Sequence, residues 1–427
     1  MRKRVAGIIL FFLILYAILN IYSFTGIQQF TGLFEKEIFR NMIHWGWWII
    51  PFFLIFCMIL FMSVFYSTQH PVWMSLFYET IGMFMLLFIP NLFFTVFLLL
   101  QDLLSSLYNL VDLMLHFSND SFHFSLRNTP LRFISISGLM MYTIALIIIL
   151  YGILFGRFNF RIKNVTIPLQ IHSSNLDGIR IIQISDLHIG SLWFYQKRFK
   201  KVIRMINDLT PDIILFTGDM VNDLALEMNG WKEILGILNA RYGKYSILGN
   251  HDYGEYYNWD TPEDKSENLR QIIIQQEKMG FQVLANSSVE VDIEGERIGI
   301  LGVENWGLPP FKQYGDLEKA MSGTNSLPFK ILMSHDPSHW DAEVLGKTDI
   351  DLTLSGHTHG FQFGIRTRWF TWSPVQYKYP RWEGLHKTGN QYLNVNTGLG
   401  YIGFPGRIGI PPEVTCITLE TKRTSKD

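Results

Sequence analysis

Four long apolar runs, with almost no charge around them, constrain the fold of this chain more than any other feature. The first 156 residues contain seven Lys or Arg and six Asp or Glu, whereas the rest of the chain contains 29 and 31. Crossing the hydrocarbon layer of a membrane takes about 20 mostly apolar residues. The runs of that length are roughly Val5–Phe24, Trp45–Tyr66, Ile81–Leu100 and Phe133–Phe155. We therefore expect residues 1–156 to form a transmembrane region of about four helices.

Basic residues at both ends of this region predict its orientation. Residues 2–4 are Arg-Lys-Arg, and Arg157, Arg161 and Lys163 follow the fourth apolar run. An even number of spans places both clusters on one side, and basic flanks favour the cytoplasmic side. We therefore predict a multi-pass integral membrane protein whose remaining residues lie in the cytoplasm.

One segment leaves the number of spans open. Leu103–Phe117 is amphipathic and is associated with two carboxylates, Asp102 and Asp112. We interpret it as a helix that lies at the membrane interface. As a fifth span it would move the rest of the chain to the opposite side of the membrane.

Charge and cysteine content argue against a nucleic-acid partner and against a disulfide. The net charge of the chain is −1, so electrostatics does not support a nucleic-acid partner. The two cysteines are Cys57, in an apolar run, and Cys416, in a predicted strand. We expect no disulfide between them.

After about residue 162, short β-branched runs alternate with longer stretches of helical periodicity. Ile179–Ser185 reads as a buried strand, and further strands are predicted at residues 212–218, 243–249, 329–334, 350–356 and 413–420. The sequence from 289 to 304 predicts a hairpin that turns at Gly295. This alternation predicts an α/β domain.

Polar residues stand where five of these strands end. In open α/β sheets, ligand sites gather beyond the carboxyl ends of strands, so distant segments meet there. Imidazole and carboxylate groups suit zinc, manganese and iron. Taken one at a time, these motifs have ordinary structural explanations as turns or local hydrogen bonds, and seven other histidines lie outside the pattern. The residues in the pattern are Asp186, His188, Asp219, Asn250, His251, Asp252, His335, His357 and His359.

The order of the motifs DLH, GDMVND, GNHD, SHDP and GHTHG resembles the calcineurin-like metallophosphoesterase superfamily over roughly residues 175–420. The closing stretch at 403–419 is similar to that of the membrane-anchored bacterial branch (YkuE/YaeI-like). The resemblance implies a four-layer αββα sandwich with two mixed sheets, in a bacterial inner or plasma membrane. It divides the chain at residues 1–156, 157–174 (linker and first strand), 175–420 (phosphoesterase domain) and 421–427 (charged tail).

The resemblance also implies a role for each residue of the pattern. Asp186, His188 and His359 would bind one divalent ion, and Asn250, His335 and His357 a second. Asp219 would bridge the two ions, which would be Mn, Fe or Zn. His251 would face the substrate and act on the leaving oxygen, with Asp252 holding its ring. Hydroxide held between the ions would attack phosphorus.

This sequence departs from many relatives at Phe361, where they have Gly. A ring there alters the mouth of the site, so Phe361, Arg366 and Arg368 are candidate substrate-binding residues. The stretch 363–387 interleaves aromatic and basic residues. It either contacts a phosphate-linked head group or anionic lipid, or is a long loop with ordinary packing.

Three functions remain open at this point. The first is hydrolysis of a phosphoester or pyrophosphate bond in a lipid-linked or membrane-proximal substrate, as in a UDP-diacylglucosamine pyrophosphatase. The second is a phosphodiesterase or phosphatase acting on soluble nucleotides or phosphoproteins. The third is a non-catalytic scaffold or sensor, which the complete set of ligand-type residues disfavours.

Overall fold

The structure is a computed structural model that describes residues 2–32, 34–68, 70–116, 129–169 and 174–421. It divides into two compact units. One contains Met1–Leu60 and Glu79–Tyr151, and the other contains Phe61–Tyr78 and Gly152–Asp427. The tail predicted for 421–427 lies, apart from Thr421, outside the described residues.

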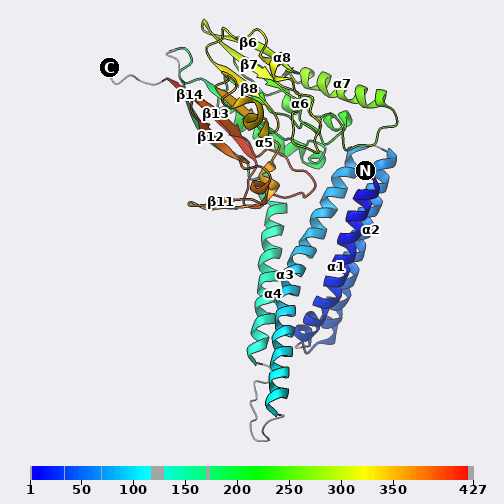
Figure 1. Cartoon of the computed structure of the whole chain (residues 1–427). Helices are drawn as coiled ribbons and strands as arrows, with labels where there is room; N and C mark the ends of the chain where they lie inside the picture. The colour runs from blue at the N-terminus through cyan, green and yellow to red at the C-terminus, as the bar shows by residue number, and fades with distance from the viewer. Residues whose placement is uncertain (1, 33, 69, 117–128, 170–173, 422–427) are drawn as a thin grey trace. The chain divides into compact units, whose positions relative to one another are not determined.

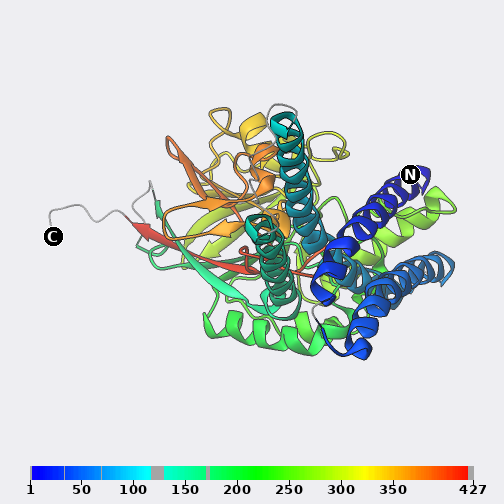
Figure 2. The same cartoon turned by 90° about the horizontal axis from the view of Figure 1, so that it is seen from below.

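Four long helices carry the apolar runs (Figure 1 and Figure 2). Within the described residues all four are long and apolar enough to cross a membrane, as predicted. Buried amides join two of them: the Asn91 side chain donates to Asn20 Oδ1 (3.2 Å), which also accepts from Tyr16 (3.3 Å). Helices in a membrane use such bonds because lipid offers polar groups no partner. The helices are α1 (Arg2–Thr31), α2 (Glu37–Thr68), α3 (Pro71–His116) and α4 (Thr129–Leu154).

The separate interfacial helix predicted for Leu103–Phe117 was wrong. Helix α3 continues through this segment to His116, and Phe117 lies outside the described residues. The segment contains no Gly or Pro after Leu100, so nothing in it ends a helix. At a rise of about 1.5 Å per residue, α3 is roughly twice as long as the hydrocarbon layer is thick.

The second unit contains two six-stranded mixed sheets and a two-stranded ribbon. The first sheet has the order β1-β14-β2-β3-β4-β5, and β2 to β5 run parallel. Its strands are β1 (Arg161–Leu169), β2 (Arg180–Ile184), β3 (Ile213–Phe216), β4 (Lys244–Ser246), β5 (Gln282–Val283) and β14 (Glu413–Thr421).

The second sheet has the order β12-β13-β9-β8-β7-β6, in which β13, β9, β8 and β7 run parallel. The hairpin between β6 and β7 turns at Gly295, as predicted. Its strands are β6 (Ser287–Ile293), β7 (Glu296–Gly302), β8 (Lys330–Met333), β9 (Leu352–Ser355), β12 (Gly384–Thr388) and β13 (Gln391–Val395).

Apolar side chains fill the space between the sheets and cover their outer faces. Ile181 and Ile213 of the first sheet share one buried cluster with Ile331 and Leu352 of the second. Helix α5 (Gln196–Asp208) and α7 (Pro262–Lys278) bury Phe199 and Ile272 on the outer face of the first sheet. Helix α8 (Leu317–Met321) packs with Trp340 against the second sheet. The predicted helix–sheet–sheet–helix layering is confirmed.

Candidate metal centre

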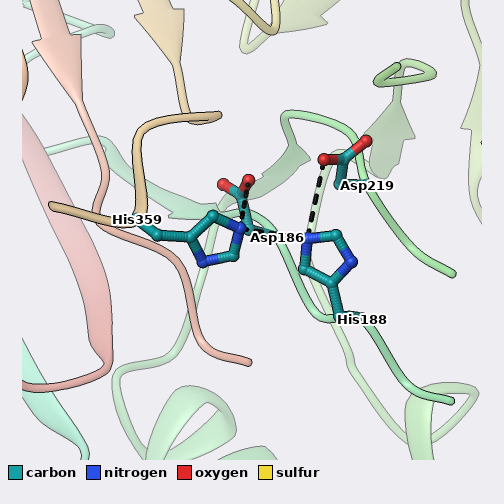
Figure 3. A group of neighbouring side chains, drawn as sticks. All are labelled: Asp186, His188, Asp219 and His359. Atoms are coloured by element: carbon teal, nitrogen blue, oxygen red, sulfur yellow. Dashed lines mark hydrogen bonds and ion pairs between the residues drawn. The ribbon is translucent and has the colours of Figure 1, made fainter. Parts of the chain in front are cut away.

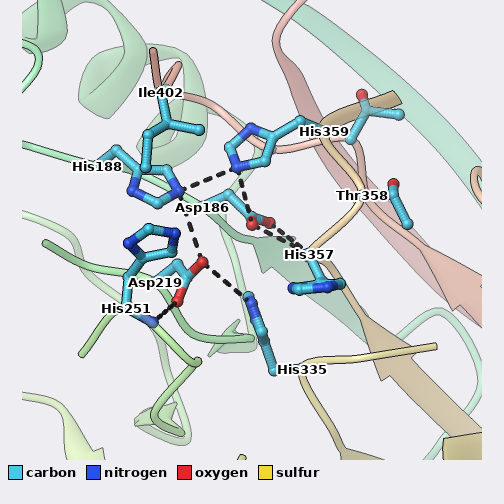
Figure 4. A network of polar contacts seen from close by, with 12 residues as sticks. Asp186, His188, Asp219, His251, His335, His357, Thr358, His359 and Ile402 are labelled. Carbon is cyan, nitrogen blue, oxygen red and sulfur yellow. Dashed lines mark hydrogen bonds and ion pairs between the residues drawn. The ribbon is translucent and has the colours of Figure 1, made fainter. Parts of the chain in front are cut away.

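The carboxyl ends of strands from both sheets meet at one place (Figure 4). Asp186 and His188 follow β2, Asp219 follows β3, and residues 250–252 follow β4. His335 follows β8, and His357 and His359 follow β9. The two sheets therefore bring together residues that are up to 173 positions apart in the sequence, from Asp186 to His359 (359 − 186).

The first group of candidate ligands is Asp186, His188, Asp219 and His359, whose ligand atoms all lie within 4.8 Å of one another (Figure 3). His359 Nε2 lies 3.3 Å from Asp186 Oδ1, and His188 Nε2 lies 3.5 Å from Asp219 Oδ2. The Nε2 atoms of His188 and His359 are 3.0 Å apart. Ring nitrogens and carboxylate oxygens therefore converge on one point.

The second group is Asp219, His335 and His357, within the same 4.8 Å limit. His335 Nε2 lies 3.1 Å from the same Asp219 Oδ2 that faces His188. His335 Nδ1 lies 2.7 Å from the carbonyl oxygen of Thr217, which fixes the ring. Burial opposes its protonation, but Asp219 raises the pKa of His335 to about 10, so Nε2 becomes a ligand when a cation displaces its proton. The two groups thus share Asp219, whose carboxylate lies between them.

Asn250 has an oxygen available to this second group. Its amide nitrogen donates to the Tyr256 hydroxyl (2.8 Å), whereas its Oδ1 is buried and has no hydrogen-bond partner among the described residues. A buried acceptor without a partner is costly. A divalent cation would satisfy this oxygen, so the side chain fits a metal-binding role.

The backbone at the site adopts conformations that side chains disfavour. Five of the ten non-glycine residues with positive φ in the described chain are Asp186, His188, Asp219, His357 and His359. Such conformations cost about 1–3 kcal/mol each and gather at functional sites. With these backbone conformations, the side chains of the short turns point toward one another.

Two glycines leave room for the carboxylates. A Cβ at Gly249 would lie 2.2 Å from Asp219 Oδ1, and one at Gly356 would lie 2.3 Å from Asp186 Oδ2. A larger residue at either position would push a carboxylate out of its group.

Burial favours the neutral form of the imidazoles and of the carboxyls alike, and it raises the pKa of Asp186 to about 6. It lowers the pKa of His188 to about 3 and that of His357 to about 4, so both rings are neutral at physiological pH. Burial opposes ionisation of Asp219, yet His335 and His251 hold the pKa of that carboxyl well below its usual range. Neutral imidazoles beside buried carboxylates form a ligand set for a dication, because a cation offsets the cost of burying the charge.

His251 lies beside the first group, but Asp252 does not hold its ring. His251 Nδ1 lies 2.7 Å from the carbonyl oxygen of Asn222. The centroids of the His251 and His188 rings are 4.9 Å apart. The expectation that Asp252 orients His251 was therefore wrong. A carboxylate adjacent in sequence points to the other side of the chain here, where backbone donors surround it.

Asp252 instead fixes the loops that carry the ligands. Its carboxylate accepts four backbone N–H bonds, at 2.9 Å from Asp219, Met220 and Gly249 and at 3.2 Å from Val221. These bonds join the turn after β3 to the turn after β4. Asp252 thereby positions Asp219, the residue that the two groups share.

Replacing Asp252 with Asn should destabilise the catalytic unit by about 3 kcal/mol or more, because an amide NH₂ would face buried N–H donors that lose their acceptor. We also expect a 10- to 100-fold fall in metal affinity, which is usual for residues that support ligands. Thermal unfolding and metal titration measure the two effects. If Asp252→Asn is as stable as the parent protein and shows the same kinetic defect as a His251 variant, Asp252 does orient the His251 ring.

Sequence reasoning missed two aromatic residues of the site. Tyr256 packs against the His251 ring at 4.4 Å and accepts the Asn250 bond. The Tyr379 hydroxyl lies 2.9 Å from His357 Nε2. Tyr256 lies in the loop directly after GNHD, and this proximity was the one available signal.

Arg407 is buried behind the first group, and no catalytic role was predicted for it. It donates to the carbonyl oxygens of Thr397 (2.8 Å) and Gly400 (2.6 Å), and one of its nitrogens lies 3.5 Å from His359 Nδ1. It holds the closing loop against His359.

The three candidate substrate-binding residues do not lie together. Phe361 is 60% exposed and lies two residues after His359. Arg366 forms an ion pair with Glu383, and the guanidinium of Arg368 lies 5.1 Å from the ring centre of Trp369. The hydrogen bonds and ion pairs of the described residues connect neither arginine to the metal groups.

Beyond its strand ends the fold carries two buried carboxylate–imidazole groups that suit divalent metals, and comparison with known proteins identifies the family. The chain belongs to the calcineurin-like phosphoesterase family. Residues 179–361 match "Calcineurin-like phosphoesterase", and residues 2–157 match "Probable Calcineurin-like phosphoesterase, transmembrane domain". The chain is therefore a membrane-associated member of this family, and it spans less than two thirds of the length of several relatives that it matches.

Three relatives illustrate the similarity. The uncharacterized metallophosphoesterase YkuE of Bacillus subtilis is 34% identical over 60% of this chain and 84% of its own length. A transmembrane protein with metallophosphoesterase domain from Danio rerio is 29% identical over 65% of this chain, and the match spans 61% of that relative. The UDP-2,3-diacylglucosamine pyrophosphatase LpxG of Chlamydia muridarum is 29% identical over 45% of this chain and 67% of its own length.

Proposed function

We propose that this membrane protein hydrolyses a phosphoester or pyrophosphate bond of a lipid-linked or membrane-proximal substrate at a dinuclear metal centre. The observation that carries the proposal is the pair of ligand groups that share Asp219. Asp219 Oδ2 faces both groups, so one carboxylate oxygen could serve two neighbouring cations, and family members use divalent metals.

The proposed ligands divide between the two groups. Asp186, His188 and His359 would hold one ion and Asn250, His335 and His357 the other, with Asp219 shared between the two groups. Mn, Fe and Zn all suit these donors. When bound, the ions supply Lewis acidity that activates water and neutralises phosphoryl oxygens.

His251 acts on the leaving group in this proposal. With its Nδ1 proton donated to the Asn222 carbonyl, the ring orientation is fixed and Nε2 is the atom left for the substrate. Burial lowers the pKa of His251, so the negative charge of a bound phosphate is what favours the imidazolium form. The ring then donates a hydrogen bond or proton to the leaving oxygen.

Two observations support a substrate at the membrane. The catalytic residues belong to the same chain as four apolar helices, and the mouth of the site carries an exposed Phe361 where a polar substrate alone needs no ring. The LpxG relative is named as a pyrophosphatase of UDP-2,3-diacylglucosamine. The second candidate is hydrolysis of soluble nucleotides or phosphoproteins, which the same metal groups would catalyse.

The test compares substrates on the full chain in lipid nanodiscs. We expect hydrolysis of UDP-diacylglucosamine or a phospholipid, loss of activity after chelation, and recovery with Mn²⁺ because the metals activate the water. Phosphate release and metal analysis of the same sample are the measurements. Equal or faster turnover of nucleotides would favour the second candidate. If the metal-loaded protein hydrolyses no phosphoester, the non-catalytic scaffold or sensor role is the one that remains.

We also propose that the catalytic domain faces the cytoplasm, because basic residues such as Arg157 flank the last span. Fused to the C-terminus in a bacterial host, a fluorescent protein should be bright and alkaline phosphatase inactive. The reverse pattern would place the domain outside.

A further inference from the structure

A small ribbon beside the metal site exposes a row of aromatic and apolar side chains. Strands β10 (Ile365–Arg366) and β11 (Thr371–Trp372) pair antiparallel and close through a turn. We call residues 363–372 the aromatic hairpin. Its exposed fractions are 86% for Trp369, 54% for Phe370, 50% for Ile365 and 39% for Phe363.

This exposure is unusual for a surface in water. Contiguous apolar patches on soluble domains mark interaction sites, and Trp in particular favours the membrane–water interface. The hairpin reaches outward from its own unit, so its tip has no cover from the described residues around it. The ribbon is labelled β11 in Figure 1.

The charge of the aromatic hairpin indicates the chemistry of its partner. Residues 363–372 contain Arg366 and Arg368 and no acidic residue. Arg366 is engaged by Glu383, whereas the guanidinium of Arg368 lies over the ring of the exposed Trp369 at the tip. Aromatic side chains with an adjacent basic group suit a surface that is apolar below and anionic at its rim.

The base of the hairpin is connected to the end of a membrane helix. Phe363 forms a bridge with Ile408, and Gly364 N–H donates to the Ile408 carbonyl at 2.8 Å. The neighbouring Arg407 N–H donates to the carbonyl of Gly152 at 3.2 Å. Gly152 belongs to the last turn of α4, within the candidate span Phe133–Phe158.

These contacts lie within one compact unit and join the base of the hairpin to Gly152, near the C-terminal end of α4. From Phe363 to the turn the strand rises about 3.3 Å per residue, so the tip lies roughly 10–15 Å from that base. The headgroup layer on each side of the hydrocarbon is about 5–8 Å deep, so a tip at this distance from its base is long enough to enter it.

We propose that the aromatic hairpin docks on the bilayer that α4 crosses. Trp369 and Phe370 enter the headgroup layer, and Arg368 meets lipid phosphate. Docking does not depend on the proposed substrate. The role of docking in catalysis rests on the proposed lipid-linked substrate. In that role, Phe361 and Phe363 extend the apolar surface from the docked tip to His359 and give an acyl chain a path to the metal groups.

A spectroscopic experiment tests docking without reference to activity. The native Cys57 and Cys416 are buried and are replaced by Ser, and Trp369→Cys carries an environment-sensitive NBD label. The matched control is Lys278→Cys, at the exposed end of α7. The full chain is placed in nanodiscs containing anionic phospholipid, with and without doxyl-labelled lipid.

We expect blue-shifted emission and quenching by doxyl lipid at position 369 and neither effect at position 278. Equal, water-like signals at both positions would overturn the proposal. So would a blue shift at 369 that doxyl lipid does not quench, because it would indicate a protein partner or a second copy.

A kinetic experiment tests the consequence separately. Trp369→Ser should raise KM for a lipid-linked substrate about tenfold or more, the change that corresponds to one aromatic side chain no longer buried. The kcat for bis(p-nitrophenyl) phosphate and the metal content should stay unchanged. Quenching at 369 without any lipid-linked activity would leave docking intact and contradict the proposed substrate. An unchanged KM for the lipid-linked substrate in Trp369→Ser would contradict the proposed path for the acyl chain.

Discussion

Replacing Asp219 with Asn should reduce hydrolysis of every phosphoester to background and remove metal from both ligand groups. The substitution preserves the shape of the side chain and its acceptance of the His251 N–H bond (2.9 Å), but removes the charge that both groups share. His188 and His335 both face its Oδ2. Asp186→Asn should disturb mainly the first group, because Asp186 belongs to that group alone and the amide oxygen still accepts the His357 backbone N–H. Metal analysis by mass spectrometry, together with phosphate release, measures the effect.

The matched control is Asp223→Asn, in the same buried loop. Burial and the neighbouring Glu227 raise the pKa of Asp223 well above its usual range, which favours the neutral form of this side chain. An amide closely resembles that neutral form, and the variant should retain metal and activity. Full metal occupancy in Asp219→Asn would rule out the shared-ligand assignment.

The second large effect concerns His251. Replacing it with Ala should lower kcat by about 10²–10⁴, the usual contribution of a general acid, and leave the metal content unchanged. The defect should shrink for p-nitrophenyl esters, because a good leaving group needs little protonation. Steady-state kinetics over a series of leaving groups tests both statements.

His386→Gln provides the comparison for this experiment. The His386 ring also contacts a backbone carbonyl, that of Glu383 at 3.0 Å, but it belongs to β12, away from the ligand groups. It should have ordinary kinetics with every ester. A His251→Ala defect of equal size for poor and good leaving groups would argue against proton donation and for a purely structural role.

Much of the fold was predictable because its signals are local. The apolar runs exceed the length that a membrane span requires, and the strands of the soluble unit are short, β-branched and bounded by turns. The extent of α3 was not predictable in the same way. The polar residues near Asp102 are typical of an interfacial helix. The segment contains no helix breaker, however, so α3 continues through it.

The candidate site, like the fold, was predictable from the sequence only in part. By itself the sequence determined which residues stand at strand ends, because parallel strands of one sheet end at one edge. Only the tertiary structure decided that Asp219 faces both groups, that a carbonyl of Asn222 rather than Asp252 orients His251, and that the base of the aromatic hairpin adjoins Gly152. The physical reason is that side-chain direction and contacts between distant loops follow from turn geometry and packing, which neighbours in sequence do not specify.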